Sequence, residues 1–161
     1  MKVKIRGIVR IWKDGVLIKE VENKIHFDTL AQILYQVLNN SPPSGTYTPS
    51  IEVLNNGTFE FAVPVTYSNF VWKGTLTSSS PFSITCLVLY ATFNGYSFRA
   101  SDVTTALSLP AGTYTIEWIW VVDDPVGFVK DILNFGFAGV YKSYSITAGT
   151  CTHVISITIY N

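Results

Sequence analysis

The sequence is poor in charge and has no long apolar run, and both shortages restrict the class of protein. Charged residues make up 14% of the 161 residues and hydrophobic residues 48%, whereas roughly 25% charge is typical of soluble domains. This composition argues against intrinsic disorder, which needs low hydrophobicity and high charge. The longest apolar runs, such as Leu87–Ala91, are far shorter than the roughly 20 residues of a membrane-spanning helix. The first residues alternate charged and apolar side chains, so no signal peptide is expected.

Cysteine and histidine are also scarce, with two of each. Two cysteines make neither a disulfide framework nor a zinc site of the usual spacing. Cys86 lies in an apolar run and is expected to be a buried small residue, and a bridge from it to Cys151 is left open. His26 and His153 would need a cysteine from elsewhere to bind zinc, and no pair of these residues has metal-type spacing. We therefore expect no metal and no cofactor.

Sequence motifs of the common enzyme classes are missing. No G-x-S-x-G turn is present for a nucleophilic serine, and no P-loop or dinucleotide fingerprint occurs. Asp123-Asp124 is the only adjacent carboxylate pair that could serve glycoside hydrolysis, and a helix cap before Pro125 explains it more simply. Glu117 lies in an apolar strand. On the solvent face it would be an ordinary residue, whereas on the core face it would require a partner. We expect no catalytic residue and no enzymatic activity.

The formal net charge is zero, but the charges are unevenly distributed along the chain. Residues 1–28 contain seven basic and four acidic side chains, a charge of +3, and the other residues contain four basic and seven acidic ones, a charge of −3. The basic first segment, in which Trp12 lies near Arg10, could contact phosphates weakly. Glu20 and Glu22 on the following segment reduce that potential.

The first 23 residues predict a β-hairpin. Residues 2–12 alternate strictly, which is typical of a half-buried strand, and residues 16–23 form the returning strand after the turn Lys13-Asp14-Gly15. A two-residue loop would oppose Arg10 to Lys19, two like charges. A three-residue loop with a bulge at Gly15 is therefore preferred. It opposes two pairs: Arg6 with Glu22, and Ile11 with Leu17.

A helix is predicted after the hairpin, capped by Asp28 or Thr29 and ending at Asn39-Asn40. Its apolar residues follow helical spacing: Leu30, Ile33, Leu34, Val37 and Leu38. Residues 40–50 contain two prolines in succession and are expected to form a loop. A short second helix over residues 126–135 is suggested by Asp123-Asp124-Pro125.

The remaining segments are rich in Val, Ile, Thr and aromatic residues and predict strands. Their ranges are 51–54, 58–66, 69–77, 82–93, 113–122, 141–147 and 152–160. In residues 113–122, Tyr114, Ile116, Trp118 and Trp120 share one face. Strands at this spacing predict a mainly β fold, one antiparallel β-sandwich domain of jelly-roll type over residues 1–161.

Aromatic residues and sequons offer further binding hypotheses. The 23 aromatic side chains could form a sugar-binding platform, although core packing explains them more simply. Sequons begin at Asn39 and Asn56, and whether either asparagine is glycosylated is left open. Few Met and Cys residues, with many Ile, Val and Tyr residues, are compatible with a thermophilic source.

Two segments resemble small structural proteins of tailed phages and related viruses, including archaeal ones. The first is VRIWKDGVLIKEVENKIHFDTLAQILYQVLNN, a hairpin leading into a short helix. The second is FNGYSFRASDVTTALSLPAGTYTIEWIWVV, which combines a Thr/Ser-rich strand, a glycine turn and an aromatic strand. The resemblance implies a virion protein without catalytic residues.

The expected function is therefore a virion structural protein, a capsid, decoration or tail subunit. Its expected partners are other copies of itself and other virion proteins. The alternative is a β-sandwich module that binds carbohydrate or a host surface. The charge difference between the first segment and the rest of the chain would favour head-to-tail contact between copies.

Overall fold

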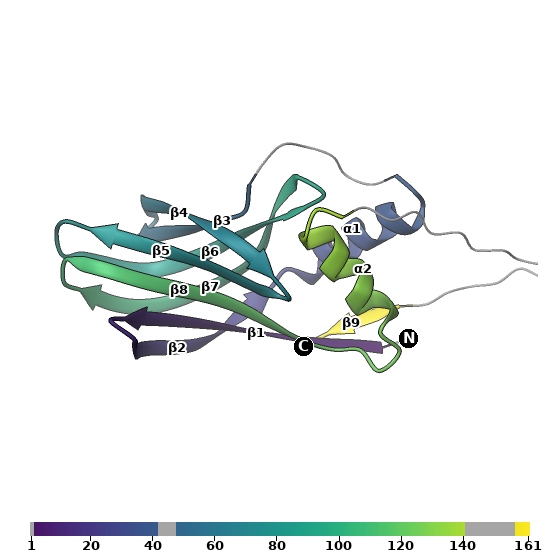
Figure 1. Ribbon diagram of the computed structural model, residues 1–161, viewed down its shortest axis with the longest axis horizontal. Helices are drawn as coiled ribbons and strands as arrows, with labels where there is room; N and C mark the ends of the chain where they lie inside the picture. Colours follow the sequence, from purple (N-terminus) through teal and green to yellow (C-terminus); the bar gives the residue numbers. More distant parts are fainter. Residues whose placement is uncertain (1, 42–47, 141–156) are drawn as a thin grey trace, which may run out of the picture.

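The computed structural model describes residues 2–41, 48–140 and 157–161, which form nine strands and two helices (Figure 1). The first half contains β1 (Lys2–Lys13), β2 (Val16–Ile25), α1 (Phe27–Leu38), β3 (Ser50–Asn55), β4 (Thr58–Ser68) and β5 (Val71–Ser78). The second half contains β6 (Phe82–Phe93), β7 (Tyr96–Leu109), β8 (Gly112–Asp123), α2 (Phe128–Phe137) and β9 (Thr158–Tyr160). The predicted strand at residues 141–147 lies outside the described residues, as do Cys151 and His153. Of the predicted strand at residues 152–160, only the end is described, and it contains β9.

The strands close into an eight-stranded antiparallel barrel. Their order is β2-β7-β6-β3-β4-β5-β8-β1, and the pairing of β1 with β2 joins the two ends. The mainly β class is therefore confirmed, whereas the predicted sandwich is wrong. Closure depends on two strands that change partner along their length. β2 pairs with β1 and then, at Lys24 and Ile25, with β7, while β4 pairs with β3 and then, from Val65, with β5.

The register of the first hairpin differs from the predicted one. The loop has two residues, Asp14 and Gly15, both with positive φ, as a type I′ turn requires. Glu22 lies opposite Ile8, and Leu17 lies opposite Trp12. Ile11 lies opposite Lys19 and Trp12 lies opposite Leu17, so Ile18 has no partner in β1. The β-bulge is therefore at Ile18 in β2 and not in the turn. Opposite charges still meet across the hairpin, since Arg10 faces Glu20.

Two-residue turns with positive φ also join later strands. Asn56-Gly57 connects β3 to β4, and Asn94-Gly95 connects β6 to β7. Asn69 and Phe70 form a third such turn, so β5 begins two residues later than predicted. β7 is a 14-residue strand that periodicity missed, although the virion-protein resemblance implied a strand there.

The barrel interior is filled by side chains. The predicted inward face of β8 is confirmed, because its aromatic and aliphatic residues are buried: Tyr114, Ile116, Trp118 and Trp120. In Figure 1 the two helices lie at the same end of the barrel. From α2, five residues are buried: Val129, Ile132, Leu133, Gly136 and Phe137. The interior is thus a packed core.

Both predicted helices form, but their starts differ from the predicted ones. α1 begins at Phe27 with His26 as N-cap and has no side-chain cap from Asp28 or Thr29. Its predicted end is confirmed by Asn39 as C-cap. α2 begins two residues late, after Gly127 with a left-handed φ of 84°, a conformation that glycine adopts without steric cost.

Candidate functional site

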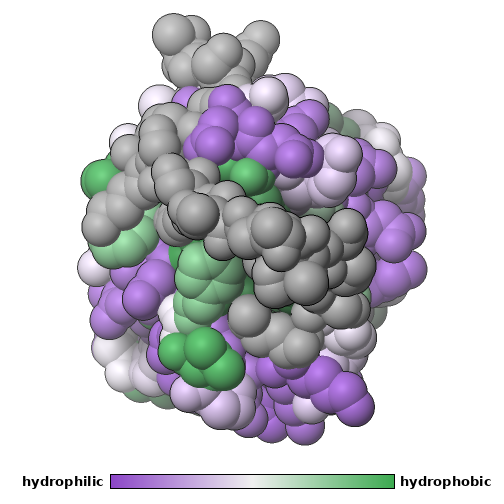
Figure 2. All heavy atoms as spheres, turned by 90° about the vertical axis from the view of Figure 1, so that its right-hand side faces the viewer, coloured by the Kyte–Doolittle hydropathy of each residue, from purple (hydrophilic) through white to green (hydrophobic). Residues whose placement is uncertain are grey.

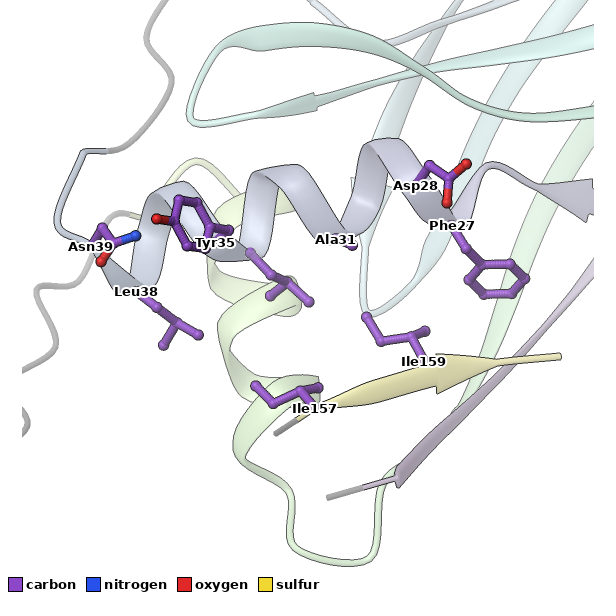
Figure 3. Close-up of a pocket in the computed structure, with 9 residues that line it drawn as sticks. Phe27, Asp28, Ala31, Tyr35, Leu38, Asn39, Ile157 and Ile159 are labelled. Carbon is purple, nitrogen blue, oxygen red and sulfur yellow. The ribbon is translucent and has the colours of Figure 1, made fainter. Parts of the chain in front are cut away.

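An apolar groove lies between α1 and β9 at the helical end of the barrel (Figure 3). Its volume is about 460 Å³. Nine residues line it: Phe27, Asp28, Ala31, Leu34, Tyr35, Leu38, Asn39, Ile157 and Ile159. Figure 2 faces this end of the molecule and shows hydrophobic side chains at the surface among hydrophilic ones.

The helical wall of the groove arises from a second apolar stripe on α1. Leu30, Ile33 and Val37 face the core and are buried. Ala31 and Tyr35 occupy the neighbouring face, and Tyr35 is 71% exposed. Residues four apart lie above one another on a helix, so this second stripe forms a continuous wall. α1 is therefore more apolar than its buried face alone requires.

The opposite wall consists of the segment that contains β9. Ile157 and Ile159 are two residues apart and therefore project to the same side of an extended chain. Both are partly buried and pack against the core cluster. β9 runs parallel to β1, with Ile159 opposite Val3. The two walls are thus more than 100 residues apart in the sequence, and only the fold brings them together.

Polar groups lie at the two ends of the groove. Figure 3 shows Asp28 at the start of α1 and Asn39 at its far end. Asp28 lies in the first turn, where the helix dipole favours a negative charge. Asn39 caps the last turn through its backbone N–H, which donates to Tyr35 O at 3.1 Å. The stretch between them is apolar apart from the Tyr35 hydroxyl.

A polar cluster holds the start of α1 against the barrel wall. His26 Nε2 lies 2.6 Å from Asp102 Oδ2, and Arg99 Nη2 donates to the same oxygen at 3.3 Å. The His26 backbone N–H donates to Ala100 O at 2.9 Å. These contacts join the β2–α1 junction to β7, so His26 has a positioning role in the described structure.

Cys86 lies in β6, on the barrel wall next to β7, and is a free thiol. It is half-buried and not in the core as predicted, because a strand irregularity between Ile84 and Cys86 shifts the alternation of β6. Burial, and secondly the charge of Asp102, raise the pKa of the Cys86 thiol above its ordinary value. The thiolate is the nucleophilic form of cysteine, so this environment does not activate Cys86.

A second polar cluster lies inside the barrel and was not predicted. The Asn23 amide oxygen accepts from Ile8 N–H at 3.0 Å and from Trp118 Nε1 at 3.1 Å, and its nitrogen donates to Ser101 Oγ. Ser101 Oγ donates to Lys24 O at 2.7 Å. Gly7 faces Asn23, and a Cβ at Gly7 would overlap the Asn23 amide. These buried polar groups satisfy one another, as a structural network must.

The carboxylates singled out from the sequence do not converge on a common site. Asp124 Oδ2 accepts from the Lys130 backbone N–H in the first turn of α2 at 3.0 Å. The N-cap is Gly127, and Pro125 precedes the helix. Glu117 faces outward on β8, opposite Arg10 on one side and Lys73 on the other. The solvent-face interpretation of Glu117 is therefore confirmed.

The basic hairpin has an internal counter-charge. Arg10 Nε donates to Glu20 Oε2 at 3.0 Å on the exposed face.

Among the described residues, no group of three His, Cys, Asp or Glu side chains is placed to hold a metal ion. Within the same ranges, no helix is both long and apolar enough to cross a membrane.

The sequence was only partly informative about the groove. The stripe on α1 was predicted, but Ala31 and Tyr35 were not recognised as a second apolar face.

Comparisons of the chain with protein-family models, curated proteins and solved structures give no match. Because one fold supports many functions, a function has to be inferred from the groove and its surroundings.

Proposed function

We propose that this protein is a structural subunit that self-associates through its helical end, and that it is a virion protein without enzymatic activity. The virion assignment rests on the sequence resemblance. The observation that supports self-association is the apolar groove between α1 and β9, with Tyr35 exposed at its wall. We propose that a second copy covers this face.

The groove suits a protein partner better than a small polar ligand. Small-molecule sites combine an apolar pocket with a few convergent polar groups. Here Asp28 and Asn39 lie at opposite ends of α1 (Figure 3), so they do not converge on one ligand atom. An apolar centre with a polar rim is the usual anatomy of a protein interface.

The distribution of charge also suits contact between copies. Only 14% of the residues are charged and the net charge is zero, so long-range repulsion between identical chains is weak. The charge is uneven along the sequence, +3 over residues 1–28 and −3 over the remainder, and we propose that this difference helps to orient two copies. Complementary charge favours encounter and orientation more than final affinity.

Sedimentation velocity of the full chain over a concentration series tests self-association. Tyr35→Asp places a charge on the groove wall and should weaken association by about tenfold or more, the effect of losing a central interface residue. Phe59→Asp is the matched control, because Phe59 is also an exposed aromatic residue, at 55% exposure. It lies beside the β3–β4 turn, away from α1.

Three outcomes would contradict the proposal. A monomer at all concentrations, in low and high salt, would exclude self-association. Absence of the protein from purified virions by mass spectrometry would exclude the virion assignment. Equal weakening by Tyr35→Asp and Phe59→Asp would show that the groove is not the interface, whereas loss with Tyr35→Asp alone would support it.

A further inference from the structure

We infer that β9 is exchanged between subunits, so that the β9 segment of one copy lies on β1 of a neighbouring copy. This inference rests on the proposed self-association and specifies how it occurs. The segment that binds is a defined part of a second copy, residues 157–160. Its binding surface, which we call the seat, consists of the edge of β1 at Lys2–Lys4 and the adjoining side of α1.

The pairing of β9 differs from every other strand pairing in the described residues. β9 is parallel to β1, with three opposed pairs: Lys2 with Thr158, Val3 with Ile159, and Lys4 with Tyr160. The other pairings are antiparallel. A tight turn joins antiparallel strands, whereas parallel strands need a long crossover. No local turn therefore ties β9 to the β1 of its own chain.

The seat has to be filled by some copy of β9. The pairing of β2 with β1 begins at Gly7, so the β1 edge at Lys2–Lys4 meets β9 instead. Ile157 and Ile159 cover part of the hydrophobic core. An empty seat would expose this apolar surface and leave strand-edge groups unpaired, and such edges favour pairing with another chain.

Exchange preserves these contacts, because identical chains offer identical seats. The same hydrogen bonds and the same isoleucine packing form whether β9 comes from its own chain or from a neighbour. Exchange of an identical element is therefore a low-cost route to association. In the exchanged form the two walls of the groove belong to different copies, which places the groove at the subunit boundary.

The length of chain before β9 permits this exchange. Sixteen residues, 141–156, separate Val140 from Ile157. An extended chain of that length spans at most about 50–60 Å. A small domain is about 30 Å across, so a neighbour in contact is within reach. This estimate uses only the number of residues between Val140 and Ile157.

Disulfide trapping tests the exchange in the full chain. Both native cysteines are replaced, by Cys86→Ser and Cys151→Ser, and one chain then receives Lys2→Cys while another receives Thr158→Cys. Neighbouring strands are about 4.8 Å apart, within the Cα separation of about 4.4–6.8 Å that a disulfide accepts. Lys2 and Thr158 are exposed, so neither change removes a core side chain. The two chains are unfolded together, refolded together and oxidised.

Exchange predicts a covalent heterodimer on a non-reducing gel, at least tenfold more abundant than in a control mixture. The control pairs Lys2→Cys with Ser79→Cys. Ser79 is exposed and follows Ser78, which lies opposite Gly112 at the far end of β8 from Asp123, the partner of Lys4. A single chain with both Lys2→Cys and Thr158→Cys should also form disulfide-linked species.

The outcomes separate the exchange from self-association itself. Oligomers in sedimentation velocity without excess heterodimer would overturn the exchange and leave the proposed function intact. A monomer without heterodimer would overturn both. If the chain with both cysteines forms no disulfide, β9 does not lie on β1 of any copy and the exchange is also overturned. Excess heterodimer supports it.

Discussion

The two helices are similar in length and amphipathic character, but they are packed in different ways. α2, with 10 residues, ends in Phe137, whose ring lies 5.1–6.4 Å from six other aromatic rings. α1, with 12 residues, buries four side chains and lines an open groove with others. α2 is thus completed by contacts with the barrel, whereas α1 has an apolar side that the described residues leave open.

The difference in packing between the two helices indicates that α2 contributes mainly to stability and α1 mainly to association. Phe137 contacts rings from β4, β5, β6, β7 and β8 and from the turn before β5: Tyr67, Trp72, Phe93, Phe98, Trp120 and Phe70. Removing α2 from the barrel end would therefore disturb most of the barrel. Tyr35 on α1 is largely exposed, so a change there should alter association before stability.

The largest effect is expected for Phe137→Ala, which breaks the aromatic packing of α2. The substitution removes a buried ring and leaves a cavity, so the free energy of unfolding should fall by about 3–5 kcal/mol. Chemical denaturation measures this change. The counterpart on α1, Tyr35→Ala, should alter stability by no more than about 0.5 kcal/mol, as is usual for an exposed position. Equal losses for the two variants would remove the distinction between the helices.

An intermediate effect on the free energy of unfolding is expected for Gly136→Ala. The substitution should destabilise the protein, whereas a glycine-to-alanine change in a helix usually stabilises. Alanine in a helix interior normally stabilises relative to glycine by about 1 kcal/mol. Here the new Cβ would overlap the Phe93 ring, so overpacking should instead cost about 1–3 kcal/mol. Thermal and chemical denaturation measure the change. A Phe93→Leu background should reduce the cost, and stabilisation by Gly136→Ala alone would show that α2 is not tightly packed.

The smallest of the three effects is expected for Tyr67→Phe, and it depends on pH. The Tyr67 hydroxyl donates to Asn134 Oδ1 on α2 at 2.6 Å, a bond whose loss should cost about 1 kcal/mol. Burial raises the pKa of Tyr67 from 10.0 to about 12. The unfolded chain loses this proton first, so the contribution of Tyr67 is complete below pH 10 and is lost as pH rises to about 12.

Denaturation as a function of pH measures both parts of this prediction. Tyr67→Phe should make the decline in stability above pH 10 shallower than in the unaltered chain. Asn134→Ala is the matched variant, and the double variant should lose no more at neutral pH than the larger single loss. An unchanged alkaline decline in Tyr67→Phe would show that burial of this hydroxyl does not affect folding.

Much of the fold was predictable where hydrophobic alternation was regular. The faces of β8 and the core-facing stripe of α1 followed from the spacing of their apolar residues. β7 was missed because buried Ser101 interrupts its pattern, and this hydroxyl is compatible with the core only because it bonds to Asn23 and Lys24. The hairpin register was wrong because a bulge position depends on packing against both neighbouring strands.

The sequence by itself determined a mainly β chain with two amphipathic helices, because side chains repeat with period two in strands and 3.6 in helices. Tertiary structure decided the closure of the barrel, the hairpin register and the groove between α1 and β9. Backbone hydrogen-bonding groups are the same in every non-proline residue, so they do not specify which edges meet. The barrel closes where β2 and β4 change partners. Because β2 pairs with β1 only from Gly7 onward, the edge of β1 at Val3 is left to Ile159 of β9.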